Sequence, residues 1–106
     1  MLESKFQAKL IKDLKKMFPG CEILKNDSSY IQGVPDLTIL YKDKWAMLEC
    51  KKSEEADRRP NQEWYVNRFN DMSYASFIYP ENKEEVLNEL QRAFESDRST
   101  RISFGE

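Results

Sequence analysis

The sequence predicts one α/β domain, a small mixed β-sheet flanked by helices in the order α-β-β-β-α-β-α. A length of 106 residues fits a single domain with one core. A content of 40% hydrophobic and 34% charged residues is ordinary for a globular protein. Helix-like and strand-like apolar patterns alternate along the chain. We place the domain in residues 1–96 and expect a C-terminal tail at 97–106, because that segment carries little core-forming material.

The N-terminal half begins with an amphipathic helix, predicted over residues 2–18 and ended by Pro19 and Gly20. Its apolar side chains recur at spacings of three and four: Leu2, Phe6, Leu10, Leu14 and Met17. A short strand at 22–25 and a polar loop at 26–33 follow. This half therefore supplies one helix and one edge of the sheet.

A β-hairpin is predicted next, from strands at 35–41 and 45–51. A charged loop at 52–59 then leads to a helix over 60–72, which Pro60 begins. The segment 74–79 is a continuous apolar strand, and 83–95 is a helix with one apolar face.

The absence of certain residue types excludes several chemistries. The chain has no histidine, which removes Ser-His-Asp and Cys-His hydrolases, His-ligated zinc and any His general base. Cys21 and Cys50 are too far apart in sequence for thiolate zinc, and we expect both to be buried thiols of a reducing compartment. Three glycines cannot form a phosphate-binding loop of the known motifs.

The net charge of −2 argues weakly against a nucleic-acid partner. A metal-dependent nuclease is an exception, because divalent cations neutralise its acidic cluster. The sequence has neither a membrane-spanning run nor the apolar segment of a signal peptide, so we expect a cytoplasmic protein without membrane contact, in a cell or an infected host.

Three charged residues lie at the open end of the predicted hairpin. With a two-residue turn at 42–43, Asp36 falls opposite Glu49, and Lys51 shares their face. A three-residue turn would put Asp36 opposite Cys50 instead, unless a bulge restored the register. Two carboxylates across a ladder repel each other, whereas a bound Mg²⁺ or Mn²⁺ reverses the sign of that interaction. The alternative is that all three are solvated charges at strand ends.

Three segments together resemble a known family: 33–37 (Gly-Val-Pro-Asp-Leu), 48–51 (Leu-Glu-Cys-Lys) and 58–64 (Arg-Arg-Pro-Asn-Gln-Glu-Trp). Their order and context are similar to the virus-type replication-repair nuclease (VRR-NUC) branch of the PD-(D/E)XK superfamily. That branch combines a G-x-P-D motif, an E-x-K motif and a P-x-Q at the start of a helix.

The resemblance implies a restriction-endonuclease-like core and an endonuclease that hydrolyses DNA phosphodiester bonds with Mg²⁺ or Mn²⁺. Similar small stand-alone proteins are typically phage homodimers related to Holliday-junction resolvases, so branched DNA is an expected substrate. The metal would be held by Asp36, Glu49 and the backbone carbonyl of Cys50. Lys51 would assist the attacking water or the developing charge, and Gln62 would orient the site.

The remaining site residues each have a structural alternative. Glu3 is expected to complete the metal site, although an acidic residue in a first helical turn also suits the helix dipole. Gln62 could simply be an exposed polar residue. We expect Lys52, Arg58 and Arg59 to bind phosphates, with solvated loop charges as the alternative. The aromatic residues of the second long helix, Trp64, Tyr65 and Phe69, suit a core or dimer contact better than base stacking.

Two rival functions remain open. One is a catalytically inactive, restriction-like DNA-binding or structural subunit, against which the intact Asp-Glu-Lys set speaks. The other is an RNA-directed nuclease on the same scaffold. Nothing in the sequence separates DNA from RNA, branched from linear duplex, or one metal ion from two.

Overall fold

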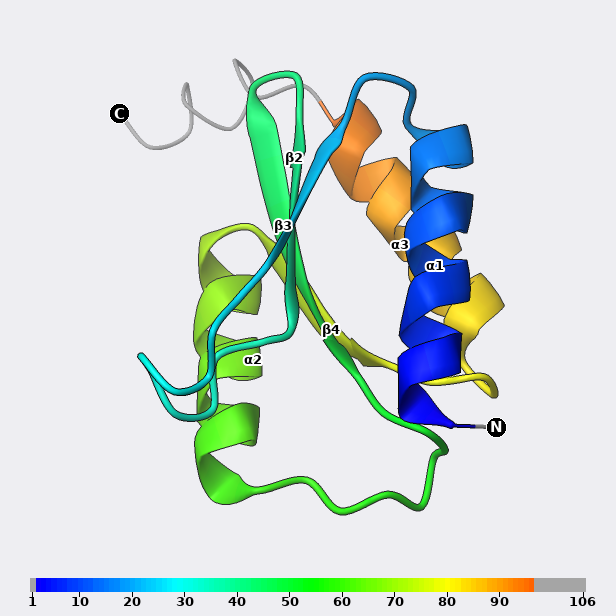
Figure 1. Cartoon of the computed structure of the whole chain (residues 1–106). Coiled ribbons are helices and arrows are strands. Elements are labelled where there is room, and N and C mark those ends of the chain that lie inside the picture. Colours follow the sequence, from blue (N-terminus) through cyan, green and yellow to red (C-terminus); the bar gives the residue numbers. More distant parts are fainter. Residues whose placement is uncertain (1, 97–106) are drawn as a thin grey trace.

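A four-stranded sheet with helices on both faces makes up the part of the chain that the computed structural model describes, residues 2–96 (Figure 1). In chain order the elements are α1 (Glu3–Met17), β1 (Glu22–Lys25), β2 (Leu37–Tyr41), β3 (Lys44–Cys50), α2 (Pro60–Met72), β4 (Tyr74–Ile78) and α3 (Lys83–Glu95). This order confirms the predicted α/β class. The expected tail at 97–106 lies outside the described residues.

The sheet has the order β1-β2-β3-β4 and is mixed. The first three strands form an antiparallel meander, and β4 lies parallel to β3. A parallel pair requires a crossover connection, and α2 provides it. The connection leaves the end of β3 just after Cys50 and returns to the sheet at Tyr74, so the charged loop 52–59 starts at the edge where the hairpin opens.

The β2–β3 hairpin has the two-residue turn that the sequence predicts. Tyr41 pairs with Lys44, and Leu37 pairs with Leu48. Lys42 takes up a left-handed conformation in the turn, with φ of 58°. One residue beyond the last pair, the register places Asp36 opposite Glu49. The backbone N–H of Asp36 donates to Glu49 Oε1 at 3.1 Å, so the expected register is confirmed.

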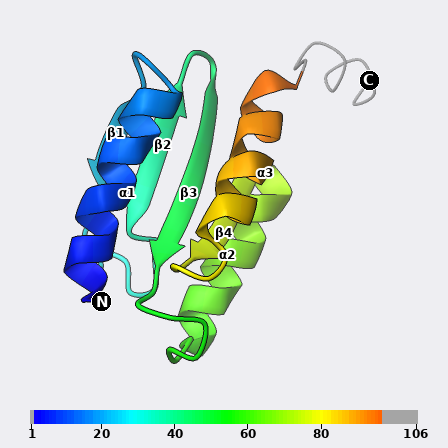
Figure 2. The same ribbon diagram turned by 90° about the vertical axis from the view of Figure 1, so that its right-hand side faces the viewer.

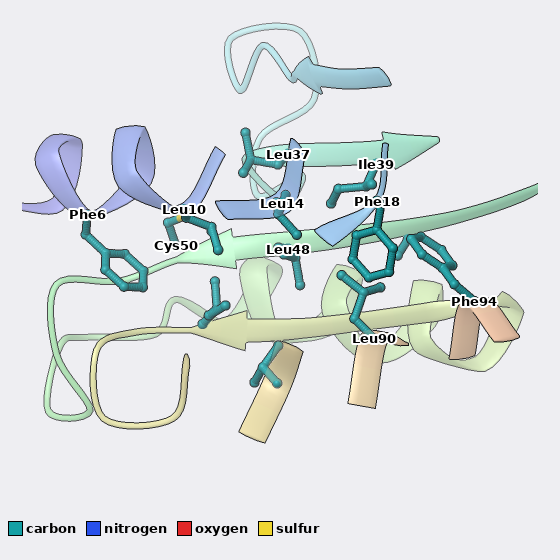
Figure 3. Packing of buried hydrophobic residues seen from close by; sticks show 13 residues of the cluster. Phe6, Leu10, Leu14, Phe18, Leu37, Ile39, Leu48, Cys50, Leu90 and Phe94 are labelled. Atoms are coloured by element: carbon teal, nitrogen blue, oxygen red, sulfur yellow. The ribbon is translucent and has the colours of Figure 1, made fainter. Parts of the chain in front are cut away.

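The main core fills the space between one face of the sheet and the pair α1 and α3 (Figures 2 and 3). Of the predicted apolar stripe of the first helix, Phe6, Leu10 and Leu14 are buried there and Met17 is partly buried. Leu2 is exposed, contrary to the prediction, because it precedes the first turn of the helix. The other buried members from helices and strands are Phe18, Leu37, Ile39, Ala46, Leu48, Cys50, Ile78, Val86, Leu90 and Phe94. Removing this apolar surface from water is the main stabilising contribution to the fold.

The opposite face of the sheet is covered by α2, which packs against β3 and β4. Val66 and Phe77 belong to this smaller cluster, with Met47 and Phe69 partly buried against it. Glu49 pairs with Phe77 across the parallel ladder, so the two side chains share a face. The acidic end of the hairpin therefore faces the side of α2.

Two further expectations can be compared with the structure. Both cysteines are free thiols, but Cys21 is only partly buried, whereas Cys50 lies in the core. Among the helices that the structure describes, none combines the length and the apolar composition needed to cross a bilayer.

Candidate active site

The loop before β2 is fixed against α2 at Gly33. This residue has φ of +94°, which favours glycine. A Cβ at this position would lie 2.8 Å from Asn61 Cγ and 3.0 Å from the Asn61 backbone carbon. Only glycine lets the loop approach the first turn of α2 so closely. The first and third motifs of the sequence, distant along the chain, therefore meet at this point.

Asp36 and Glu49 are held side by side by reciprocal hydrogen bonds from the backbone. The N–H of Cys50 donates to Asp36 Oδ2 at 2.8 Å, and the N–H of Asp36 donates to Glu49 Oε1 at 3.1 Å. Each bond fixes one oxygen of one carboxylate. Cys50 sends its side chain into the main core, so it takes part in this site through its backbone alone.

Burial disfavours the ionised form of both carboxylates, and the charge of Asp36 adds to this effect at Glu49. Desolvation raises the pKa of Asp36, although the hydrogen bond from Cys50 and the charge of Lys51 oppose that rise. Desolvation, followed by the charge of Asp36, raises the pKa of Glu49 to about 7, with a further small contribution from Glu3. Paired carboxylates destabilised in this way are typical of functional sites.

Gln62, in the first turn of α2, connects Glu49 to Lys51. Its Nε2 donates to Glu49 Oε2 at 3.0 Å. Its Oε1 accepts from Lys51 Nζ at 2.8 Å and from the backbone N–H of Arg59 at 3.1 Å. Lys51 Nζ also lies 3.8 Å from Glu49 Oε2. The two donors at Oε1 determine the orientation of the amide, since the reverse orientation would point its NH₂ group at an ammonium group.

An open pocket of about 620 Å³ surrounds this network. Its lining includes four carboxylates (Glu3, Asp36, Glu49, Asp57) and three cationic side chains (Lys51, Lys52, Arg59). With every carboxylate ionised, the formal charge of the lining is −1. A bound divalent cation would change this to +1, the sign that attracts a phosphate.

Most of the predicted site residues come together here. Asp36, Glu49, Lys51 and Gln62 form the hydrogen-bonded centre, and Glu3, Lys52 and Arg59 line the pocket around it. Arg58 is placed elsewhere. Its guanidinium lies over the ring of Phe77, 4.3 Å from the centroid, and 5.7 Å from that of Tyr79.

The residues present fit a hydrated hard cation and do not fit zinc. Within residues 2–96, no three side chains of Cys, Asp or Glu are close enough to enclose a metal ion by themselves. Asp36 and Glu49 provide two carboxylates, and Mg²⁺ commonly binds through one or two carboxylates while keeping several waters. Glu3 lies at the rim, where it would act through such a water.

Several pocket residues have no counterpart among the predicted site residues. Ser28, Ser29 and Gln32 come from the loop before β2, and Asn61 comes from α2. Two features of the sequence could have pointed to these residues: the polar composition of the loop, and the position of Asn61 between Pro60 and Gln62. Neither feature indicates which side chains turn toward the carboxylates.

Fold and site together define a restriction-endonuclease-like α/β domain with a paired-carboxylate centre. A solved structure described as a VRR_NUC domain protein is similar, with a TM-score of 0.63 and 16% sequence identity over 88% of each chain. The chain thus has the fold of a VRR-NUC domain. No family model matches the sequence. No curated protein matches it either.

Proposed function

We propose that this chain is a divalent-metal-dependent endonuclease of the PD-(D/E)XK type that hydrolyses DNA phosphodiester bonds. The observation that carries the proposal is the hydrogen-bonded centre of Asp36, Glu49, Lys51 and Gln62 in an open pocket. A buried carboxylate and a partly buried one at the end of a hairpin destabilise a fold, and a structural role does not explain why they should be there. The VRR-NUC fold of the chain supports the same reading.

Asp36, Glu49 and the backbone carbonyl of Cys50 would hold Mg²⁺ or Mn²⁺, with Glu3 at the rim. When bound, the cation would supply a water of lowered pKa and neutralise charge on the phosphate. Because Asp36 Oδ2 and Glu49 Oε1 each accept one backbone N–H, the carboxylates keep a fixed orientation. A preorganised carboxylate pair avoids reorganisation during the reaction.

Lys51 and Gln62 would act on the reacting groups. Lys51 Nζ has one proton directed at Gln62 Oε1, which leaves further protons to donate to a phosphate oxygen or to the attacking water. Gln62 keeps Lys51 and Glu49 at a constant separation through its two ends. Lys52 and Arg59, at the pocket wall, would bind the flanking phosphates.

We further propose that the active form is a homodimer acting on branched DNA such as a Holliday junction. Trp64 is 59% exposed and packs edge-on against Tyr65. Tyr65 in turn stacks on Phe69. An exposed aromatic surface of this kind suits an isologous contact, and a two-fold axis supplies two sites for two cuts.

A panel of linear duplex, flap, four-way junction and single-stranded RNA, each with Mn²⁺, Mg²⁺ or EDTA, tests the function. We expect metal-dependent cutting of DNA, strongest on the junction. Cutting of RNA alone would favour the RNA-directed alternative. Binding of DNA without cutting in any metal would favour the inactive subunit.

A further inference from the structure

A second hollow, of about 420 Å³, opens on the other side of the loop before β2. It is lined by Asn26, Asp27, Tyr30, Ile31, Val34 and Met47. Its walls are mainly apolar, and Asn26 and Asp27 supply its polar groups. This combination suits a flat, apolar ligand with hydrogen-bonding edges.

Tyr30 lines the hollow and is the most exposed aromatic side chain among residues 2–96. Its exposed fraction is 84%, and within residues 2–96 no ring or cation is stacked on it. The other described tyrosines are buried or partly buried. Keeping a large aromatic ring in water has no structural benefit for the free protein, whereas a free ring face is what a stacking ligand requires.

The backbone around Tyr30 is held in place by local hydrogen bonds. Asp27 Oδ1 accepts from the N–H of Ser29 at 2.8 Å and from its hydroxyl at 2.6 Å, and the N–H of Tyr30 donates to the Asp27 carbonyl at 3.1 Å. Asn26 Nδ2 donates to the Pro35 carbonyl at 2.8 Å. The ring is therefore displayed on a preorganised loop, which lowers the entropy cost of binding.

The hollow adjoins the candidate active site across the loop before β2. Val34 lines both, and the neighbours of the Tyr30–Ile31 tip, Ser29 and Gln32, line the acidic pocket. The loop projects beside α2 on the side away from α1 (cyan in Figure 1). A DNA strand with a phosphate in the active-site pocket would therefore pass along the loop that carries Tyr30.

We propose that this hollow binds an unpaired nucleobase, stacked on Tyr30, of the DNA strand that enters the active site. The proposal rests on the proposed nuclease function and names a feature of its substrate. A base inside an intact duplex is stacked on both faces and must be extruded at a cost, whereas a base at a junction, flap or bulge is already free. The hollow would therefore favour DNA with unpaired bases close to the cleaved bond.

Binding to two DNA duplexes that differ by a single bulged 2-aminopurine tests the proposal. The protein carries Asp36→Asn to prevent cutting, and the measurements are fluorescence anisotropy and 2-aminopurine emission, with EDTA present. We expect tighter binding of the bulged duplex and a change in emission on binding. Tyr30→Ala should weaken binding of the bulged duplex about 5- to 150-fold, with little effect on the paired one.

Tyr30→Phe is the matched control, because it keeps the ring and should keep the preference for the bulge. Trp64→Ala removes another exposed aromatic residue and should affect both duplexes equally. Equal loss on both duplexes with Tyr30→Ala, or no loss, would overturn the proposal. The proposal would also be overturned if Tyr30→Ala changed the protein from dimer to monomer in light scattering but kept the preference for the bulged duplex. Tyr30 would then contact a second copy of the chain and not a base.

The two proposals fail in different ways. If the unmodified protein cuts no DNA while Tyr30→Ala abolishes the preference for the bulge, the nuclease function is wrong and the base site stands. If the protein cuts DNA and Tyr30→Ala has no effect on the preference, the base site is wrong and the nuclease stands.

Discussion

Gln62 Nε2 donates to Glu49 Oε2 at 3.0 Å, and this bond joins the start of α2 to the end of β3. Gln62 has a second role in its own helix, because its Oε1 accepts a hydrogen bond from the backbone N–H of Arg59. This N–H lies at the N-terminus of α2, where backbone donors have no partner within the helix. The residue that caps the first turn of the helix is thus also the residue that orients the carboxylate. Any change that unwinds the first turn of α2 will also displace Glu49.

The variant Asp36→Asn tests the metal dependence directly. It should abolish cutting and the rise in melting temperature on adding Mn²⁺, because one of the two carboxylate ligands loses its charge. The fold should survive, since the amide oxygen can still accept from Cys50 N–H, and stability without metal should be equal or slightly higher. Scanning calorimetry measures the melting temperature with and without Mn²⁺, and a cleavage assay measures the cutting. Full activity would remove Asp36 from the mechanism.

Lys51→Ala separates catalysis from metal binding. Lysine is not a metal ligand, so metal affinity should remain within a few-fold while cutting falls by about 100-fold or more. Gln62 keeps its bonds to Glu49 and to Arg59 in this variant. If titration calorimetry shows that metal binding disappears together with activity, the role given to Lys51 is incorrect.

The metal-free protein should become more stable as the pH falls from 8 to about 5. Glu49 has a pKa of about 7 in the folded state against an ordinary 4.5, so only the folded state binds this proton between those values. The gain should be about 2–3 kcal/mol, measured by urea unfolding in EDTA. Asp36→Asn should reduce the gain, because the charge of Asp36 is one cause of the shift. A flat profile would contradict the buried setting of Glu49.

Arg59 and Arg58 should respond differently to salt. Arg59→Ala should weaken DNA binding regardless of sequence and lower the slope of log K against log salt by about 1. Arg58→Ala should leave the slope unchanged and cost about 0.5–1 kcal/mol of stability, since its guanidinium packs on Phe77. A reduced slope for Arg58→Ala would show that this side chain leaves Phe77 to bind a phosphate, as its sequence position suggests.

Light scattering at micromolar concentration tests the dimer. We expect twice the chain mass of 12.6 kDa, and Trp64→Asp should shift the species toward the monomer, because a charge in an apolar contact is costly. A mass near 12.6 kDa, with activity of first order in protein, would end the dimer proposal and weaken the junction substrate with it.

The sequence predicted the elements and the hairpin register well for identifiable reasons. The helix periods are regular, and a two-residue turn leaves a single register, so the sequence places Asp36 opposite Glu49 once that turn is assumed. The pairing of Tyr41 with Lys44 excludes the three-residue turn that the sequence left open. β2 is slightly shorter than expected, because its pairing begins at Leu37 and not at Pro35.

Other parts of the site could not be predicted because they depend on tertiary packing. Whether Arg58 points into the pocket or over Phe77 depends on the path of an irregular loop, which no periodicity encodes. The contact of Gly33 with Asn61 joins segments that only the finished fold brings together. The hollow beside Tyr30 likewise combines the loop before β2 with Met47 of β3, which are distant along the chain.

The carboxylates lie at the open end of the β2–β3 hairpin, as far as possible from its turn at Lys42. Their repulsion therefore acts where a hairpin frays most readily. We expect the amide hydrogen of Asp36 to exchange with solvent water much faster than that of Ala46 in the middle of β3, and a saturating divalent ion to slow that exchange. The hairpin would thus report occupancy of the site through the opening of its own end, without any substrate present.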